Sequence, residues 1–445
     1  MAGGKFDKVA GKARPGTYIN FESTKTNTLG TSARGTVVIP LIGHTYGPAG
    51  EFITLTNGAP DVARAKLGYS IYDDNANMLL IREAFKNAAT VIVYIVKAGT
   101  KATGTGGGVK ATAKYGGTRG NALAFSIVAN PVSGFDVTVT LAGETMSVYE
   151  GVASIAALAD VEDDYLTFEA ANDEATLAAV AGVTLTGGTN GENANADVTA
   201  FLDAVEGVSF NALSFPVTDD TLKAACKSKI KYLRETIGKT VVGVVANYNA
   251  DYEGIINVTN SVKVDGVSLT NAQATAWVAG AQAGASYTES NTYKAYEGAE
   301  AIVGTKTHEQ AVAAVNNGEF FFSYSEQGEV VVEYDINSLV TIPDGKDASY
   351  RKNRVIRVFD TFAENILLNF PPNRYPNSDE GWEIMEGVGR SIIKAFADAG
   401  AITDVDLDND FSVDREASSG DQTFFNAGLK PLDSAEKLYF SVATR

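Results

Sequence analysis

Gly35-Thr36-Val37-Val38-Ile39-Pro40-Leu41-Ile42-Gly43 is a compact apolar run bounded by glycines. A strand that is buried on both faces of a sheet has this composition. The stretch NMLLIREAFK at residues 77–86 follows with helical periodicity, and VIVYIV at residues 91–96 is a second apolar run. The order strand, helix, strand indicates an α/β layer, so we predict an α/β (α+β) fold.

A second α/β unit is predicted between residues 210 and 285. Phe210–Phe215 and Thr240–Ala246 have the pattern of strands on either side of a helix at Asp219–Ile237. A βαβ order of this kind predicts that the two strands are parallel. The later elements that the sequence predicts are a helix at Asn271–Ala285, a hairpin at Glu319–Tyr334 that turns at Gln327-Gly328, and helices at Arg354–Asn369 and Trp382–Ala397.

The composition changes at GTKATGTGGG, residues 99–108, where short alternating segments begin. They include Leu123–Val128, Phe135–Leu141 and Met146–Tyr149, and they end at GGTNG, residues 187–191. Glycine tracts of this kind are typical of flexible linkers. Because one tract lies on each side, we predict a β-rich domain inserted into the α/β host.

Each end of the chain carries a short alternating segment next to turn-rich sequence. These segments are Thr17-Tyr18-Ile19-Asn20-Phe21 and Leu438-Tyr439-Phe440-Ser441-Val442. One interpretation is that both strands complete this chain's own sheet, since ordered termini are usually held locally. The other is that both are donated to neighbouring molecules, because an open sheet edge pairs readily with another chain.

The overall composition excludes several classes of protein. The chain has 445 residues, 45% of them hydrophobic, and 54 acidic against 36 basic side chains give a formal net charge of −18. This charge argues against a nucleic-acid-binding surface spread over the molecule. We find neither an apolar signal-peptide core at the N-terminus nor an apolar run of the ~18 residues that a membrane span needs. We therefore expect a protein that is made and assembled in the cytoplasm.

Residues with catalytic chemistry are sparse. Cys226 lies on the apolar stripe of a predicted helix, so we interpret it as a core residue rather than a nucleophile. His44 and His308 are too far apart in the sequence to indicate a zinc site. The glycine run 104–108 fits neither the phosphate-loop nor the dinucleotide template well, and a linker is favoured there. We predict no catalytic, cofactor-binding or metal-binding residue, and no enzyme activity.

Two charged segments allow a functional interpretation. Asp404–Asp410 resembles the start of a calcium loop, but Asn409 stands where glycine is required and Arg415 where the bidentate glutamate is required. We expect a strand there instead, with Val405 and Leu407 pointing inward. The basic stretch Arg351-Lys352-Asn353-Arg354, with Arg357, is either a solvated face or a contact patch for an acidic partner or another copy of the chain. A second basic stretch, Lys223–Arg234, has the same two interpretations.

The C-terminal third resembles a known family. Arg351–Phe370 (RKNRVIRVFDTFAENILLNF), Ala401–Val413 (AITDVDLDNDFSV) and Ser434–Val442 (SAEKLYFSV) are similar, in the same order, to the shared C-terminal domain of contractile tail sheath proteins of phages and phage-tail-like bacteriocins. Arg14–Phe21 (RPGTYINF) resembles the opening of sheath proteins of Gram-positive-type tails. Ala276–Gly280 (AWVAG) resembles the W-x-A-G helix of the family.

The resemblance implies a structural role. Subunits would stack in helical rings around a tail tube, link to one another by exchanged terminal strands, and contract to drive the tube through a target cell envelope. The implied partners are other copies of the chain, the tail tube protein, and baseplate and terminal tail proteins, without nucleic acid contact or membrane insertion. The helix at Trp382–Ala397 would face the tube through Arg390 and Lys394. The implied location is a virion or phage-tail-like particle that is assembled in the bacterial cytoplasm without a signal peptide.

A domain division follows from the resemblance and from the changes in composition. The implied fold is a mixed sheet flanked by helices, with an inserted β-rich domain and two extended arms. The expected units are an N-terminal arm at 1–28, the first part of the sheath domain at 29–98, the inserted domain at 99–191, the rest of the sheath domain at 192–345, a C-terminal inner domain at 346–430 and a C-terminal arm at 431–445.

Two other classes of protein remain as alternatives. The chain can also be read as a self-assembling surface-layer or adhesin-type protein, or as an α/β enzyme whose site carries no recognisable motif. A sheath protein should polymerise into tubes of uniform diameter and a surface-layer protein into flat lattices, whereas an enzyme should remain a small closed oligomer.

Overall fold

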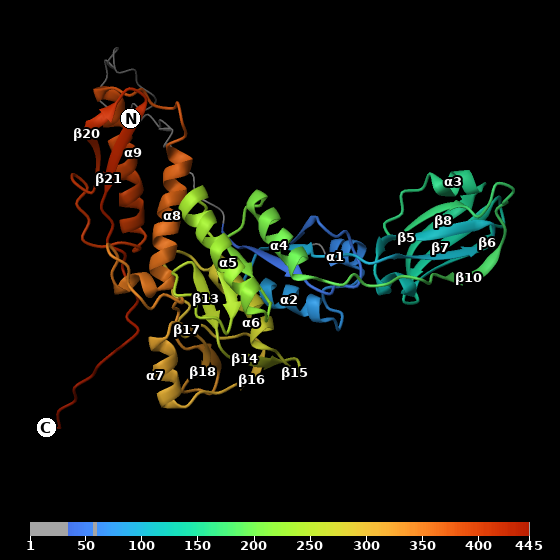
Figure 1. Cartoon of the computed structure of the whole chain (residues 1–445), viewed down its shortest axis with the longest axis horizontal. Coiled ribbons are helices and arrows are strands. Elements are labelled where there is room, and N and C mark those ends of the chain that lie inside the picture. The colour runs from blue at the N-terminus through green and yellow to red at the C-terminus, as the bar shows by residue number, and fades with distance from the viewer. Residues whose placement is uncertain (1–33, 57–59, 445) are drawn as a thin grey trace, which may run out of the picture.

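The main sheet of the protein has seven strands. The structure is a computed structural model that describes residues 34–56 and 60–444 (Figure 1); the predicted N-terminal strand Thr17–Phe21 lies outside these residues. The strand order is β17-β13-β12-β11-β1-β3-β2. The strands are β1 (Thr36–Leu41), β2 (Phe52–Thr56), β3 (Thr90–Ile95), β11 (Ala212–Ser214), β12 (Val242–Ala246), β13 (Ile255–Val258) and β17 (Glu319–Phe320).

Strand β1 is parallel to both of its neighbours in the sheet. Val37 pairs with Val91 of β3 on one side and with Ala212 of β11 on the other. β11 and β12 are also parallel, which confirms the predicted βαβ unit. β2 runs antiparallel to β3, so the sheet is mixed. The predicted α/β class with helices around a mixed sheet is confirmed.

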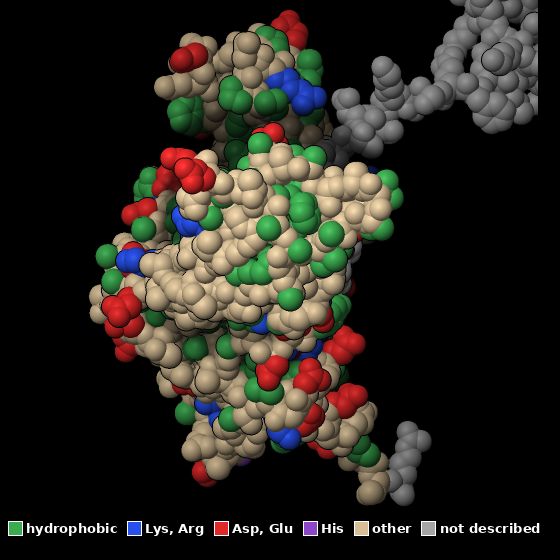
Figure 2. Space-filling model, turned by 90° about the vertical axis from the view of Figure 1, so that its right-hand side faces the viewer, with side chains coloured by type: hydrophobic (Ala, Val, Ile, Leu, Met, Phe, Trp, Pro, Cys, Tyr) green, Lys and Arg blue, Asp and Glu red, His purple; other side chains and the backbone are tan. Residues whose placement is uncertain are grey.

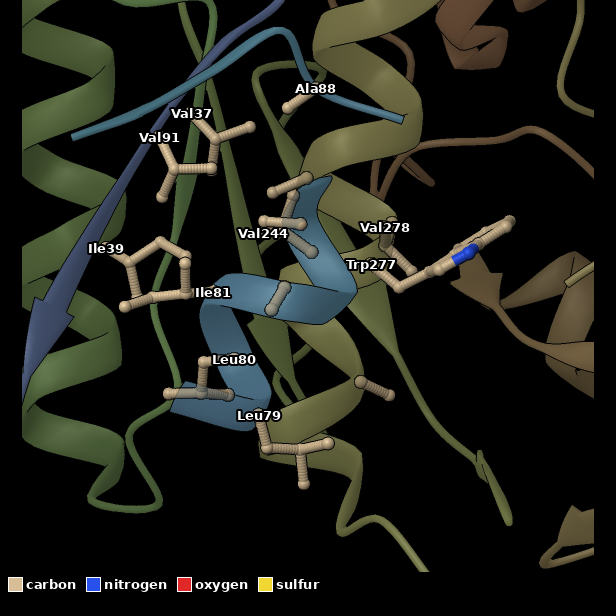
Figure 3. Close-up of a cluster of buried hydrophobic side chains, with 14 of the residues drawn as sticks. Val37, Ile39, Leu79, Leu80, Ile81, Ala88, Val91, Val244, Trp277 and Val278 are labelled. Carbon is tan, nitrogen blue, oxygen red and sulfur yellow. The ribbon is translucent and has the colours of Figure 1, made fainter. Parts of the chain in front are cut away.

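Helices cover both faces of this sheet. Val37 and Ile39 point toward one face, where Ile81 and Trp277 belong to the same core (Figure 3). Val38 points to the opposite face, into a core that contains the buried Cys226, and burial raises the pKa of this thiol. The first face is covered by α1 (Pro60–Leu67), α2 (Ala76–Phe85) and α6 (Asn271–Gly284), and the second by α4 (Asn195–Ala204), η2 (Val205–Gly207) and α5 (Asp220–Tyr232), which a π-helical turn at Leu233–Ile237 extends.

Small residues bring α6 and α2 into close contact. A Cβ atom added at Gly280 would lie 2.5 Å from the carbonyl oxygen of Ala84. Only glycine allows the two backbones to approach this closely. The W-x-A-G segment therefore has a packing role in this structure, with Trp277 stacked on Tyr296 at a centroid distance of 4.3 Å.

The β-rich insertion stands at one end of the molecule (Figure 1). It contains two sheets, with the orders β10-β6-β7-β8 and β4-β5-β9, around a shared apolar core. Its elements are β4 (Lys101–Gly106), β5 (Val109–Gly116), η1 (Thr118–Ala122), β6 (Leu123–Ala129), β7 (Phe135–Leu141), β8 (Glu144–Val152), α3 (Ile155–Ala159), β9 (Leu166–Ala170) and β10 (Val180–Thr184).

The prediction that residues 99–108 form a flexible linker is wrong. This stretch forms β4 and the tight turn into β5, in which Gly107 and Gly108 have φ values of 61° and 80°. A Cβ atom at Gly106 would lie 2.5 Å from Cγ2 of Val183. The glycines therefore allow a left-handed turn and close packing. A segment with these functions is as rich in glycine as a flexible linker.

The insertion also makes side-chain contacts with the α/β body. Tyr46 of the body lies in the core of the insertion, and its hydroxyl group donates to the carbonyl oxygen of Tyr165 at 3.4 Å. Arg119 donates to the carbonyl oxygen of Gly68 at 2.9 Å, and its guanidinium group lies 4.4 Å from the ring centroid of Tyr69. These contacts hold the insertion against the body at its base.

A smaller β layer flanks α6. The predicted hairpin turning at Gln327-Gly328 is confirmed, since Phe322 pairs with Val332 in antiparallel strands. The elements of this region are β14 (Ser261–Val264), β15 (Val267–Ser268), β16 (Ala299–Val303), α7 (His308–Asn316), β18 (Phe322–Tyr324) and β19 (Val330–Val332).

The C-terminal domain consists of two helices and a hairpin. Phe362 of the first helix packs edge to face on Phe396 of the second. The predicted strand at Asp404–Asp410 is wrong: the segment is a turn in which backbone N–H groups of Asn409 and Asp410 donate to the carbonyl oxygen of Asp406. The elements are η4 (Ala348–Arg351), α8 (Asn353–Asn369), α9 (Asp379–Asp398), β20 (Phe411–Ser419) and β21 (Gln422–Ala427).

Buried ion pairs connect α8 to the body. Arg357 lies 3.0 Å from Asp335, and Arg234, in the π-helical turn that follows α5, makes a two-pronged contact with Asp360 at 2.7 and 2.9 Å. Asp335 is fully buried; burial alone would raise its pKa, but Arg357 and three hydrogen-bond donors hold the pKa below its ordinary value. α8 thus turns a polar face to the body and an apolar face to α9.

Replacing Arg357 by methionine tests this connection. The variant R357M keeps an aliphatic side chain but leaves Asp335 as a buried charge without its cation, which should cost about 3–5 kcal/mol of unfolding free energy. Urea unfolding measures the change. The control K394M removes an exposed pair with Asp398 and should leave the stability almost unchanged. Equal stability of wild type and R357M would contradict the prediction.

His44 predicts a pH dependence of stability. Its Nε2 lies 2.9 Å from the carbonyl oxygen of Leu67, which only accepts, so Nε2 carries the proton, and Nδ1 lies 3.2 Å from the amide nitrogen of Asn77. Burial lowers the pKa of His44 from 6.5 to about 4. Between these values the unfolded chain binds a proton that the folded chain does not, so stability falls as the pH falls, by roughly 3 kcal/mol in total.

Urea unfolding between pH 7 and pH 4 measures this effect. The variant H44Q keeps a side-chain donor for Leu67 and should lose this part of the pH dependence. The exposed His308 supplies the matched control H308Q, which should behave as wild type. The same pH dependence in wild type and H44Q would refute the assignment.

Candidate assembly surfaces

The C-terminal segment extends away from the rest of the subunit (Figure 1). Residues 432–444 form no strand, and Leu438, Tyr439, Phe440 and Val442 are exposed by 67%, 90%, 84% and 91%. Leu438–Val442 pairs with no strand among residues 34–56 and 60–444. The interpretation that it completes this chain's own sheet is therefore wrong within these residues. The apolar side chains of this segment have no cover within that part of the chain.

Exposed apolar side chains at alternating positions favour pairing with another molecule. Full burial of a leucine or phenylalanine side chain is worth roughly 1.5–3 kcal/mol. An extended segment also presents unpaired N–H and C=O groups, which another sheet edge can complete. Leu438–Val442 thus has both the side chains and the backbone of a strand donor.

The hairpin β20–β21 has the properties of an acceptor. Within the described part of the chain it is a sheet of only two strands, so each strand has one edge without a partner. Its register pairs Phe411 with Ala427. Phe411 and Phe425 pack with Phe370 beneath the hairpin, whereas Phe424 is half exposed. A further strand on either edge would extend an already ordered surface.

The candidate tube-facing residues lie on α9 and are paired along the helix. Arg390 lies 3.5 Å from Glu386, and Lys394 lies 2.9 Å from Asp398. The side chain of Lys394 is 59% exposed and that of Arg390 is 40% exposed. Both cations are accessible on the helix surface, and their contact with a tube remains a prediction.

The candidate basic contact patch is occupied within the subunit. Arg351 donates to the carbonyl oxygens of Leu339 and Val315, and Arg357 is buried against Asp335. Lys352 and Arg354 instead contact the beginning of the C-terminal segment, and Arg354 is buried as well. Contact of these residues with another chain remains a prediction, which the burial of Arg354 and Arg357 does not support.

The acidic residues at the base of the C-terminal segment were missed by sequence reasoning. Lys352 lies 3.2 Å from Asp433 and also binds Glu436, and Arg354 donates to the hydroxyl oxygen of Ser434 at 2.7 Å. The opposite charges of RKNR and DSAE were a signal in the sequence. About 80 residues separate the two stretches in the sequence. Opposite charge alone does not predict which residues pair across such a separation.

Charged side chains on the face that includes the insertion lie in small separate groups (Figure 2). Acidic groups are more frequent there than basic ones, as expected for a chain with 54 acidic and 36 basic residues, and the middle of the face carries few charged side chains (Figure 2). A nucleic-acid-binding face usually carries a continuous basic stripe. The pattern on this face is that of an ordinary solvated surface. No helix in the described ranges has the length and hydropathy to cross a membrane.

Models of four protein-family domains match the chain. They are the tail sheath protein Gp18 domain III N-terminal region at residues 34–96, the phage tail sheath protein beta-sandwich domain at 97–197, the phage tail sheath protein central domain at 191–338 and the phage tail sheath C-terminal domain at 345–445. Together these matches span the α/β body, the insertion and the C-terminal domain.

Similar proteins agree with these matches. The chain is 36% identical over 472 residues to phage-like element PBSX protein XkdK of Bacillus subtilis, which covers 99% of both proteins. The sheath tail protein of Desulfitobacterium hafniense is 38% identical, with a TM-score of 0.83 over 96% of this chain and 99% of that one. The sheath tail protein of Listeria innocua is 36% identical, with a TM-score of 0.79 over 92% and 95%. The open two-stranded hairpin and the uncovered C-terminal segment therefore belong to a chain of the phage tail sheath protein family.

Proposed function

We propose that this chain is the subunit of a contractile tail sheath whose copies are linked by exchanged terminal strands. The observation that carries the proposal is the uncovered alternating segment Leu438–Val442 in a chain that also has a two-stranded hairpin with open edges. The segment Thr17–Phe21 is proposed as the second donated strand on the basis of its sequence. Sheath subunits that exchange strands in this way form a continuous mesh.

An exchanged strand contributes favourable backbone and side-chain contacts to the linkage between subunits. Each new backbone hydrogen bond contributes roughly 0.5–1.5 kcal/mol net. Burial of Leu438 and Phe440 adds roughly 1.5–3 kcal/mol each. Ordering of the segment offsets part of this gain. Since every subunit donates and accepts strands, these moderate energies add up along the polymer.

Contraction is proposed as rotation and sliding of whole subunits while the exchanged strands remain paired. The energy would come from a kinetically trapped extended state that passes to a better-packed contracted one. No nucleotide or other cofactor takes part in such a transition. We propose a domain division at residues 1–28, 29–98, 99–191, 192–345, 346–430 and 431–445, in which 29–98 and 192–345 belong to one sheath domain because β1 pairs with both β3 and β11.

The remaining partners follow from this role. We propose that α9 contacts the tail tube through Arg390 and Lys394, and that terminal rings contact baseplate and terminal tail proteins. The particle is a virion or phage-tail-like particle assembled in the bacterial cytoplasm, without catalysis, nucleic acid contact or membrane insertion by this chain. Pairing of both cations within the helix favours a tube contact that is weak enough to break during contraction.

Substitutions in the C-terminal segment test strand donation. The variant L438S/F440S/V442S removes the apolar face and should abolish tubes in purified protein, because the donated strand loses its buried side chains. The matched control Y439S changes the opposite face of the strand and should retain tubes. Negative-stain microscopy detects the assemblies, and thermal melts should be the same for all three proteins because these side chains are exposed in the subunit.

The outcome distinguishes the alternatives. Tubes that persist in the triple variant would contradict strand donation by this segment. Flat lattices of the wild type would favour a surface-layer protein, and a small closed oligomer would favour the enzyme interpretation. Unfolding of the triple variant would mean that the segment stabilises its own subunit.

Charge reversal on α9 tests the tube contact. The variant R390E/K394E should bind purified tail tubes of the same particle more weakly in a co-sedimentation assay, since both accessible cations are lost. Self-assembly of the variant should be retained. The control K263E alters an exposed cation of β14 and should bind as wild type. Unchanged tube binding of R390E/K394E would remove α9 from the proposed interface.

A further inference from the structure

The base of the C-terminal segment is fixed to its own subunit. Pro431 forms a bridge with Ile402, and the N–H group of Leu432 donates to the carbonyl oxygen of Ala401 at 2.8 Å. These contacts tie residues 431–432 to the end of α9. The backbone therefore leaves the C-terminal domain at a defined point.

Charged and polar side chains continue this attachment as far as Glu436. Lys352, the residue that precedes the first turn of α8, lies 3.2 Å from Asp433 and also binds Glu436. Ser290 donates to the second carboxylate oxygen of Glu436 at 2.8 Å. Arg354, in the first turn of α8, donates to the hydroxyl oxygen of Ser434 at 2.7 Å.

This contact is shielded from solvent, unlike the side chains that follow it. The side chain of Glu436 is only 8% exposed and that of Lys352 only 13%. Burial alone would lower the pKa of Lys352, but the hydrogen bonds to Glu436 and Tyr334 raise it above its ordinary value. The Lys352 ammonium group also lies 4.3 Å from the ring centroid of Tyr334. Ion pairs that are shielded in this way are less screened by salt than exposed ones.

We propose that Lys352, Arg354 and Ser290 form a clamp that holds Ser434 and Glu436 and so sets the starting point of the donated strand. This inference rests on the proposed strand exchange. The clamp leaves Lys437 as the single residue between the fixed Glu436 and Leu438. The pivot of the arm is thus confined to the backbone around Lys437. From there, residues 437–444 reach about 26 Å when fully extended.

The clamp explains why a basic stretch occurs at the start of α8. The acidic partner expected for this basic stretch is the chain's own C-terminal arm. Lys352 and Arg354 position the base of that arm. A fixed starting point restricts which neighbouring hairpin edge the strand reaches. It also reduces the conformational freedom that strand donation must remove.

Spin-label distances test the clamp directly in the unassembled subunit. Labels at A435C, an exposed position between the held residues Ser434 and Glu436, and at V312C report the position of the clamped segment relative to α7. The native Cys226 is buried and remains unlabelled. Wild type should give a narrow distance distribution and K352M a broad one. The charge-swapped variant K352E/E436K should restore the narrow distribution. The control K263M, which removes an exposed ion pair, should give the wild-type result.

Assembly is the second measurement. K352M should raise the protein concentration needed for tube formation by roughly tenfold, with recovery in K352E/E436K, because a buried charge pair is broken and then re-formed. A melt like that of wild type shows that the fold is intact. An unchanged distance distribution in K352M, or failure of the swapped pair to restore it, would overturn the clamp. The spin-label distances test the clamp, because they are measured in the unassembled subunit. Tube formation by L438S/F440S/V442S tests strand exchange, so the two proposals can fail independently.

Discussion

The pairing of Arg357 with Asp335 is the interaction on which the arrangement of this subunit depends. It lies where α8 meets the α/β body, and it is fully removed from water. A buried charge pair tolerates little displacement, because a separated partner would be left as an unsolvated charge. Together with Arg234 and Asp360, it gives the C-terminal domain one orientation relative to the body. α9, the open hairpin and the arm all take their positions from α8.

The same helix links the body to the parts that are proposed to assemble. The polar face of α8 contacts the body, its apolar face contacts α9, and Lys352 at its start holds the base of the C-terminal arm. In the proposed contraction, a rotation of the body would reach the arm through α8 and through the contacts of Pro431 and Leu432 with the segment after α9. The proposed clamp would confine the pivot of the arm to the residues after Glu436.

The insertion is held by a different kind of contact. Tyr46 enters its core, and Arg119 stacks on Tyr69 at its base, so the insertion is attached by packing as well as by the two chain crossings. Glycine at 106–108 serves this architecture by allowing a tight turn and close contact with β10. The insertion lies away from the hairpin and the C-terminal arm (Figure 1).

Elements whose burial follows a local period could be predicted from the amino-acid sequence. The apolar run at 35–43, the helix at Asp219–Ile237 and the hairpin at Gln327-Gly328 were predictable because neighbouring residues reveal which face is covered. Motifs spread along the chain were enough to indicate the sheath family. The role of the basic stretch at Arg351–Arg354 became visible only in the folded subunit. Its partners Asp433 and Glu436 are brought to it from about 80 residues away by the contacts of Pro431 and Leu432 with the segment after α9. Composition also failed at the glycine tract and at Asp404–Asp410. A linker, a packed turn and an acidic strand draw on the same residue types, and the backbone conformation that distinguishes them is visible only in the folded chain.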